Sequence, residues 1–175
     1  MTLGAHATSP ESELVTLDTI VRNSTTELCA AYEIKTKPAN ETGFSADFAL
    51  AGIIGFTGPI IRGTLLLAMT REGLQTSNPV PTSPPREWMG ELANQLLGRI
   101  KTQLLACGVE IYVTTPIVLR GQHLAPEALR AVNPLELMTK DGPIIVWFES
   151  DAPPDLELRK AIASEAPIEG DSFIF

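Results

Sequence analysis

The sequence is poor in the residues that build the commonest catalytic centres. It contains two cysteines and two histidines in 175 residues. No C-x-x-C pair is present, and no group of Cys, His and acidic residues has the spacing of a zinc site. The G-x-S-x-G sequence of serine hydrolases is also absent, and His6 and His123 fall in an N-terminal tail and an expected loop. An enzyme without the usual nucleophile and base must act by positioning its reactants.

Basic residues are scarce relative to acidic ones. The chain has 13 Lys and Arg against 21 Asp and Glu, a formal net charge of −8, and its pI is about 4.7. Proteins that bind nucleic acid or anionic membranes need a basic surface, so both functions are excluded. The charge instead fits a protein whose partner has a positive or mixed surface.

Long hydrophobic runs are missing as well. No apolar run approaches the ~20 residues of a membrane span, and residues 1–13 lack the basic and apolar regions of a signal peptide. The sequence therefore predicts a cytoplasmic protein with reduced thiols. Cys29 and Cys107 both fall in apolar helical patterns, and we interpret them as small buried hydrophobic residues.

The overall amino-acid composition is that of a globular protein. Hydrophobic residues make up 44% of the chain, and 175 residues are enough for one domain with a sizeable core. We expect a flexible N-terminal lead over residues 1–9, a single domain over 10–163 and a C-terminal tail over 164–175. The motif Ser9-Pro10-Glu11 predicts a helix start, and the apolar period that follows predicts a first helix over 10–31.

Hydrophobic patterning predicts the remaining elements. Residues 32–39 alternate like a strand, and 48–69 contain two apolar runs joined by a turn, which is typical of a hairpin. The order that follows is a short helix, a proline-rich connection, a long helix ended by Gly108 and a second hairpin from two strand-like runs. These segments are 70–77, 78–85, 86–107, 110–121 and 142–150.

Residues 155–164 fit either an edge strand or a short helix. Because the strands join mostly by short turns, the predicted fold class is α+β, a mostly antiparallel sheet with long helices packed on it.

The first hairpin carries three regularly spaced glycines, Gly52, Gly55 and Gly58. Their G-x-x-G-x-x-G spacing matches neither the dinucleotide-binding nor the P-loop pattern. We therefore interpret them as sites of turns and close strand contacts rather than as a phosphate-binding loop.

The long helix has two distinct faces. At about 100° per residue, one face collects the apolar residues and must face the core. The opposite face carries a straight stripe about 20 Å long. Asn and Gly are poor helix formers, so their presence there favours a docking surface over an ordinary solvated face. The stripe consists of Glu87, Glu91, Asn94, Gly98 and Lys101.

Residues 90–121, GELANQLLGRIKTQLLACGVEIYVTTPIVLRG, resemble the signature of the CheX/CheC family of chemotaxis response-regulator phosphatases. That signature is Asp or Ser, three residues, Glu, two residues, Asn and a distant Pro. Glu91 and Asn94 match its central pair, and Pro116 matches its proline. The glycine-punctuated hairpin also resembles the family's strand pair, and the resemblance covers residues 10–160. A single E-x-x-N is more similar to CheX than to CheC.

The sequence departs from the family pattern at three points. Glu87 stands where the family has Asp or Ser, and Asn94 and Pro116 enclose 21 residues, one fewer than the pattern. Leu97 and Arg99 are bulkier than the residues usual there. These departures bear on partner choice and rate more than on fold.

The resemblance implies a CheC/CheX-like fold and the hydrolysis of an aspartyl phosphate on a CheY-type receiver. Asn94 would orient the attacking water in the receiver's site, and Glu91 would pair with the receiver's lysine. Glu87, Gly98 and Lys101 are the further residues expected to contact the partner. The protein would need no cofactor of its own, because the receiver holds Mg²⁺. The family also implies a homodimer, joined by sheet edges or swapped strands.

Two alternatives share this fold. One is a domain that binds a receiver without hydrolysing its phosphate, and the other is a flagellar-switch-like interaction domain.

Overall fold

The structure is a computed structural model that describes residues 12–39, 50–121 and 134–161. Its helices are α1 (Leu17–Ala31), α2 (Arg71–Ser77) and α3 (Pro85–Ala106). Its strands are β1 (Ser12–Val15), β2 (Lys37–Pro38), β3 (Leu50–Thr57), β4 (Arg62–Met69), β5 (Tyr112–Val113), β6 (Ile117–Arg120), β7 (Leu135–Thr139), β8 (Gly142–Asp151) and β9 (Leu158–Ala161).

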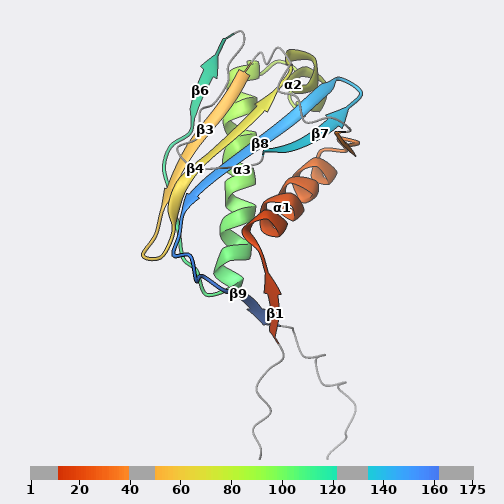
Figure 1. Ribbon diagram of the computed structural model, residues 1–175. Helices are drawn as coiled ribbons and strands as arrows, with labels where there is room; N and C mark the ends of the chain where they lie inside the picture. The colour runs from red at the N-terminus through yellow and green to blue at the C-terminus, as the bar shows by residue number, and fades with distance from the viewer. Residues whose placement is uncertain (1–11, 40–49, 122–133, 162–175) are drawn as a thin grey trace, which may run out of the picture.

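The main sheet is antiparallel at every described pairing. Its strand order is β2-β7-β8-β4-β3-β5, and β6 pairs with β3 further along the same edge as β5. At one end of the molecule β1 and β9 form a separate two-stranded antiparallel sheet (Figure 1). The predicted class, α+β with a mostly antiparallel sheet, is confirmed.

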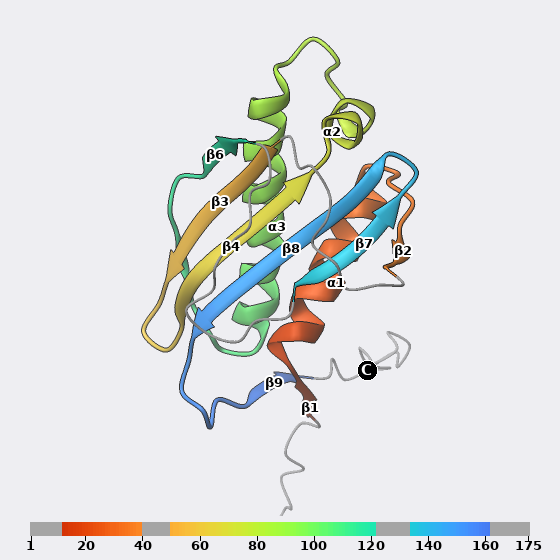
Figure 2. The same ribbon diagram turned by 45° about the horizontal axis from the view of Figure 1, so that its top comes forward.

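One face of the main sheet is covered by α1 and α3, while α2 lies at the end of the sheet (Figures 1 and 2). Alternate residues of each strand point towards these helices, as the pleat of a strand requires. Phe56 and Phe148 stack there with ring centroids 5.0 Å apart. On α3 the predicted core face is fully buried: Met89, Leu92, Ala93, Leu96, Leu97, Ile100 and Leu104.

Helix α3 packs closely against the sheet at a glycine. A Cβ atom on Gly52 would lie 2.9 Å from the Ala93 Cβ and 3.2 Å from the Met89 carbonyl oxygen. A Cβ on Gly58 would lie only 2.2 Å from the Glu110 carbonyl oxygen. Both glycines therefore permit close packing, as the sequence indicated: Gly52 between β3 and α3, and Gly58 between the turn after β3 and the segment that follows α3.

The predicted start of the first helix, at residue 10, is wrong. Residues 12–15 form β1, and α1 starts after Thr16, whose Oγ1 accepts a hydrogen bond from the Thr19 N–H at 3.1 Å. Pairing with β9, which lies more than 140 residues further along the chain, decides the conformation of 12–15. Such a long-range contact leaves no local signal, so the apolar period alone extended the helix too far.

Two other segments differ from expectation, and the structure decides a third that the sequence left open. Only Lys37–Pro38 of the predicted strand 32–39 pairs, because residues 32–34 terminate α1. The second hairpin is β7–β8, and β7 was missed although Leu135 and Leu137 alternate inwards. The open choice at 155–164 is decided in favour of a strand, β9.

Two predicted features are confirmed: the first hairpin and the short helix α2. The expected lead 1–9 and tail 164–175 lie outside the described residues.

Candidate functional site

The stripe predicted on the long helix faces outwards. Glu87, Glu91, Asn94 and Gly98 are exposed, and Lys101 is partly exposed. Most of the residues between them are buried, so the helix presents its polar groups to solvent from a packed support. The structure thus meets the geometric condition that a docking surface on α3 requires.

A groove of about 590 Å³ runs beside the first half of this stripe. From α3 it is lined by Arg86, Glu87, Gly90, Glu91 and Asn94. Its other wall consists of Thr114, Thr115, Pro116 and Val118. The distant proline of the signature therefore lies opposite the glutamate and the asparagine, which only the fold could establish.

The second wall is a break in the edge strand. Between β5 and β6 the ladder against β3 is replaced by Thr114, whose Oγ1 accepts from the Gly55 N–H at 3.0 Å. The Thr114 N–H in turn donates to the Gly55 carbonyl at 2.9 Å. Proline has no N–H to contribute to a ladder, so Pro116 suits such a break. The break places Thr114 and Thr115 in the wall of the groove.

Helix α3 lies close to this break at Gly90. A Cβ at position 90 would lie 3.5 Å from the Val118 Cγ2 and 4.0 Å from the Pro116 Cγ, which are ordinary van der Waals distances. The space beside Gly90 therefore accepts a methyl group but not a long side chain, and this small residue helps β6 to lie against the helix.

The two central residues differ in how they are held. The Gln95 Nε2 donates to the Glu91 Oε1 at 2.7 Å, so the carboxylate is tethered to the next turn of the helix. None of the described residues forms a hydrogen bond with the Asn94 carboxamide, which is exposed. Glu91 is thus oriented within the chain, whereas the Asn94 amide keeps its donor and acceptor for something outside it.

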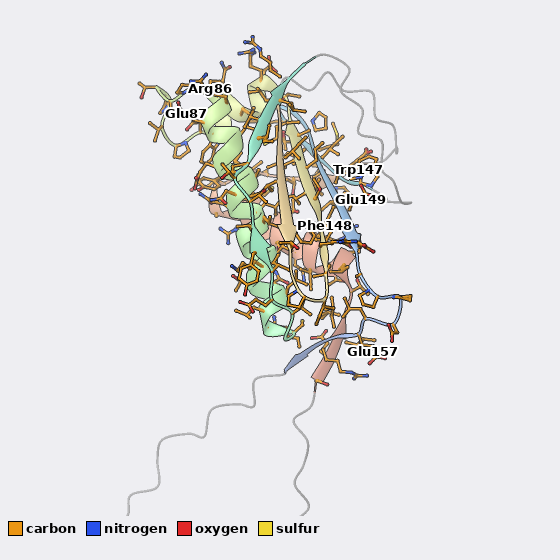
Figure 3. All side chains as sticks on the ribbon, turned by 90° about the vertical axis from the view of Figure 1, so that its left-hand side faces the viewer. Arg86, Glu87, Trp147, Phe148, Glu149 and Glu157 are labelled. Atoms are coloured by element: carbon orange, nitrogen blue, oxygen red, sulfur yellow. The ribbon has the colours of Figure 1, made fainter. Side chains whose placement is uncertain are left out.

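The other three predicted contact residues lie at different distances from the groove. Glu87 lines it and sits in the first turn of α3, where a carboxylate also stabilises the helix dipole. Figure 3 shows Arg86 and Glu87 at this end of the helix, pointing away from the sheet. Gly98 lies one turn beyond Asn94, and a Cβ there would have no heavy atom within 4 Å.

Lys101 lies further from the groove than the other stripe residues and contacts Tyr112 of β5. Its Nζ lies 6.0 Å from the centroid of the Tyr112 ring. Hydrogen bonding to Glu110, together with the charge of that carboxylate, raises the pKa of Tyr112. The phenol therefore stays neutral well above physiological pH, and Lys101 meets an uncharged ring.

The groove has little formal charge. One cation, Arg86, and two anions, Glu87 and Glu91, line it. Across the described ranges, no group of three or more Cys, His, Asp or Glu side chains is arranged to hold a metal ion. Within the same ranges, no helix is long and apolar enough to cross a membrane.

Sequence reasoning missed half of the groove. Arg86, Gly90, Thr114, Thr115 and Val118 all line it. The signal available for this wall was Pro116, since a proline inside a strand-like run indicates a break or a bulge. That this break would face the polar side of α3 depends on the tertiary packing.

The chain matches one family model and several solved structures. The model described as chemotaxis phosphatase CheX matches residues 50–137, which is 88 of the 175 residues. The chain is similar to the chemotaxis protein CheX from Vibrio vulnificus, with 16% identity, a TM-score of 0.69 and coverage of 78% of this chain and 97% of that one. The CheX of Desulfovibrio desulfuricans gives 17% identity, a TM-score of 0.64 and coverage of 78% and 100%.

A third similar structure is the CheX-CheY-BeF3-Mg²⁺ complex from Borrelia burgdorferi, with 16% identity, a TM-score of 0.59 and coverage of 78% and 98%. At such identities the likeness establishes the fold. No curated protein sequence gives a significant match.

Proposed function

The chain belongs to the CheX family of chemotaxis phosphatases, and we propose that it hydrolyses the aspartyl phosphate of a CheY-like response regulator in the cytoplasm. The observation that carries this proposal is the joint exposure of Glu91 and Asn94 at one groove, with Pro116 opposite. The similar structure from Borrelia burgdorferi is a complex of CheX with CheY, which supports a CheY-like partner.

In the proposed reaction Asn94 enters the receiver's site and holds a water in line with the phosphorus. The water oxygen bonds to phosphorus as the bond to the aspartate oxygen breaks, which releases inorganic phosphate and restores the carboxylate. A carboxamide both donates and accepts hydrogen bonds, so it can orient this water without changing its own protonation. Mg²⁺ held by the receiver would neutralise charge on the phosphoryl group, so this chain needs no base with an unusual pKa.

Glu91 has the complementary role of fixing the docked orientation. Its carboxylate stands one turn before Asn94 on the same face of α3, so both residues reach a partner together. We propose that it pairs with the lysine beside the receiver's phosphate. A glutamate on an acidic protein suits a partner whose key group is a cation.

The proposal is tested by following the decay of phosphate on CheY phosphorylated with acetyl phosphate in Mg²⁺. Asn94→Ala is expected to slow the catalysed decay by roughly 100-fold, because the water loses its positioning group. Its affinity for CheY loaded with BeF3⁻ and Mg²⁺ should be nearly unchanged. Glu91→Ala is expected to weaken that affinity by about 5- to 10-fold, or about 1 to 1.4 kcal/mol, which is the upper end for an exposed ion pair and reflects partial desolvation at an interface.

Matched controls are available on α1. Asn23→Ala and Glu27→Ala remove the same two groups from exposed positions away from the groove, and both variants should behave like the wild type. Equal decay of phospho-CheY with and without the wild-type protein, over several receivers, would contradict the proposed hydrolysis. Tight binding without accelerated decay would instead identify a receiver-binding domain that is not catalytic.

We also propose that the protein is a homodimer joined at the β5–β6 edge of the sheet. Exposed apolar residues at a strand edge favour pairing with another chain. Four such residues lie there, with 41% to 63% of their surface exposed: Tyr112, Val113, Ile117 and Leu119. Sedimentation equilibrium should give a dimer for the wild type and a monomer for Ile117→Glu. A monomeric wild type at micromolar concentration would refute the dimer.

A further inference from the structure

The Glu91 carboxylate belongs to a hydrogen-bonded relay that crosses between two helices. Gln95, one turn further along α3, donates from its Nε2 to the Glu91 Oε1 at 2.7 Å. The Oε1 of the same Gln95 side chain accepts from the Tyr32 hydroxyl at 2.9 Å. Tyr32 is the C-cap of α1, so a residue 63 positions from Gln95 in sequence fixes the amide that holds Glu91.

The chemistry of the three groups permits one direction for this relay. A carboxylate only accepts hydrogen bonds, so the Gln95 NH₂ must face Glu91. The Gln95 carbonyl oxygen then faces Tyr32, and the phenol must donate to it. If the amide were turned over, its oxygen would face the carboxylate and repel it. The Tyr32 hydroxyl therefore selects the amide orientation that favours Glu91.

The far end of the relay is anchored in the protein core. The Tyr32 ring packs edge-on against Trp88, with centroids 4.8 Å apart and planes at 83°. Trp88 is only 6% exposed, and its Nε1 donates to the Ser77 Oγ on α2 at 3.0 Å. Tyr32 consequently has little freedom to move. Its hydrogen bond holds Gln95, and Gln95 in turn restricts the exposed Glu91 carboxylate.

We propose that Tyr32 and Gln95 are positioning residues that pre-organise Glu91 for the cationic group of the docked receiver. This inference rests on the proposed function, because it assigns Glu91 a partner. Long flexible side chains lose rotamer freedom when they bind, and a side chain that is already held loses less. The relay occupies one oxygen of Glu91, and Oε2 has no hydrogen bond within the part of the chain that the structure describes.

The inference is tested first by kinetics with phospho-CheY as the substrate. Tyr32→Phe deletes one hydroxyl and keeps the ring against Trp88, and Gln95→Met deletes the amide at nearly constant volume. Each variant is expected to raise KM about 3- to 10-fold, because Glu91 then has rotamer freedom to lose on docking, at the usual cost of immobilising one flexible side chain. The value of kcat should change less than about 2-fold, because Asn94 is untouched.

A matched control separates positioning from stability. The Gln103 Nε2 donates to the Ser24 Oγ at 3.1 Å, a second glutamine-to-hydroxyl bond between α3 and α1, about two helical turns from Gln95. Gln103→Met should lower the free energy of unfolding about as much as Gln95→Met and leave KM unchanged. An equal rise of KM in both variants would show that the effect is only structural and would overturn the inference.

A double-mutant comparison supplies the decisive result. In the Glu91→Ala background, Tyr32→Phe should cause no further rise in KM, because the residue through which it acts is gone. A rise as large as that in the wild-type background would overturn the relay.

Binding distinguishes failure of this inference from failure of the proposed function. The Kd for CheY loaded with BeF3⁻ and Mg²⁺ should rise about 3- to 10-fold in Tyr32→Phe, even if the wild type does not hydrolyse phospho-CheY. An active wild type with an unchanged Kd and KM in Tyr32→Phe would overturn the relay and leave the phosphatase intact.

Discussion

At the scale of single residues, the most informative position is Gly98. It lies on the exposed stripe of α3, and a Cβ there would have open space on all sides within 4 Å. A glycine inside a helix costs about 1 kcal/mol relative to alanine. Neither backbone conformation nor internal packing therefore explains this residue, whereas the proposed docking of a receiver would, because it needs clearance on this face of α3.

Substitution of Gly98 by alanine should separate stability from docking. We expect Gly98→Ala to raise the free energy of unfolding by about 1 kcal/mol, because alanine favours the helix. The same variant should bind CheY loaded with BeF3⁻ and Mg²⁺ more weakly, since the methyl group occupies the clearance. Urea denaturation and a binding titration measure the two effects. A more stable variant with unchanged affinity would show that Gly98 does not contact the partner.

At the scale of elements, α1 and α3 end in the same hydrogen-bonding motif with different residues. In α3 the N–H groups of Gly108 and Val109 reach back to Leu105 and Leu104, and Gly108 has φ +76. In α1 the same pattern ends at Glu33, which adopts φ 55, a conformation that a residue with a Cβ adopts at a cost.

This comparison predicts opposite effects of substitutions at the two helix ends. Glu33→Gly should raise the free energy of unfolding by about 1 kcal/mol, because glycine adopts positive φ without strain. Gly108→Ala should lower it by about the same amount, and since no heavy atom lies within 4 Å of the added Cβ, the loss reports conformation alone. Chemical denaturation with unchanged m-values would test both. If Glu33→Gly lowered the free energy of unfolding, the Glu33 side chain would stabilise the fold by more than its positive φ destabilises it.

At the scale of the whole molecule, the two cysteines differ in environment. Burial raises the pKa of the Cys29 thiol to about 11. Burial also raises the pKa of Cys107, but Cys107 is partly exposed and the charge of Lys160 opposes the shift. The sequence-based interpretation of two buried thiols is thus correct for Cys29, and wrong for Cys107 because Cys107 is the C-cap at the end of α3.

The buried thiol predicts how stability depends on pH. An unfolded cysteine ionises near pH 8.5 to 9, whereas the folded Cys29 stays neutral until about pH 11. Its stabilising contribution is therefore fully present below pH 8.5 and is lost as pH rises to 11, by roughly 3 kcal/mol. Denaturation at a series of pH values should show this loss in the wild type and a smaller one in Cys29→Ala. Cys107→Ala is the control and should follow the wild type. Parallel curves for all three proteins would contradict the shift.

Part of the candidate site could be predicted from local sequence. The exposure of Glu91 and Asn94 follows from the helical period, because Leu92, Ala93 and Leu96 must face the core. The Gln95–Glu91 bond joins neighbours at i and i+4, so it too lies within reach of sequence reasoning. The Tyr32–Gln95 bond and the groove wall at Thr114 could not be predicted from local sequence. In both places, residues far apart in the chain meet only after the helices and the sheet have packed.

The sequence by itself determined the long helix, the first hairpin, the α+β class and the exposed stripe, because each depends on local periodicity and turn chemistry. Tertiary structure decided where α1 begins, since the pairing of β1 with β9 outweighs the helical pattern of 12–15. It also decided that Pro116 would face Asn94 across a groove. Both outcomes depend on contacts between segments far apart in the sequence. These contacts stabilise the structure only after the chain has folded and the core has formed.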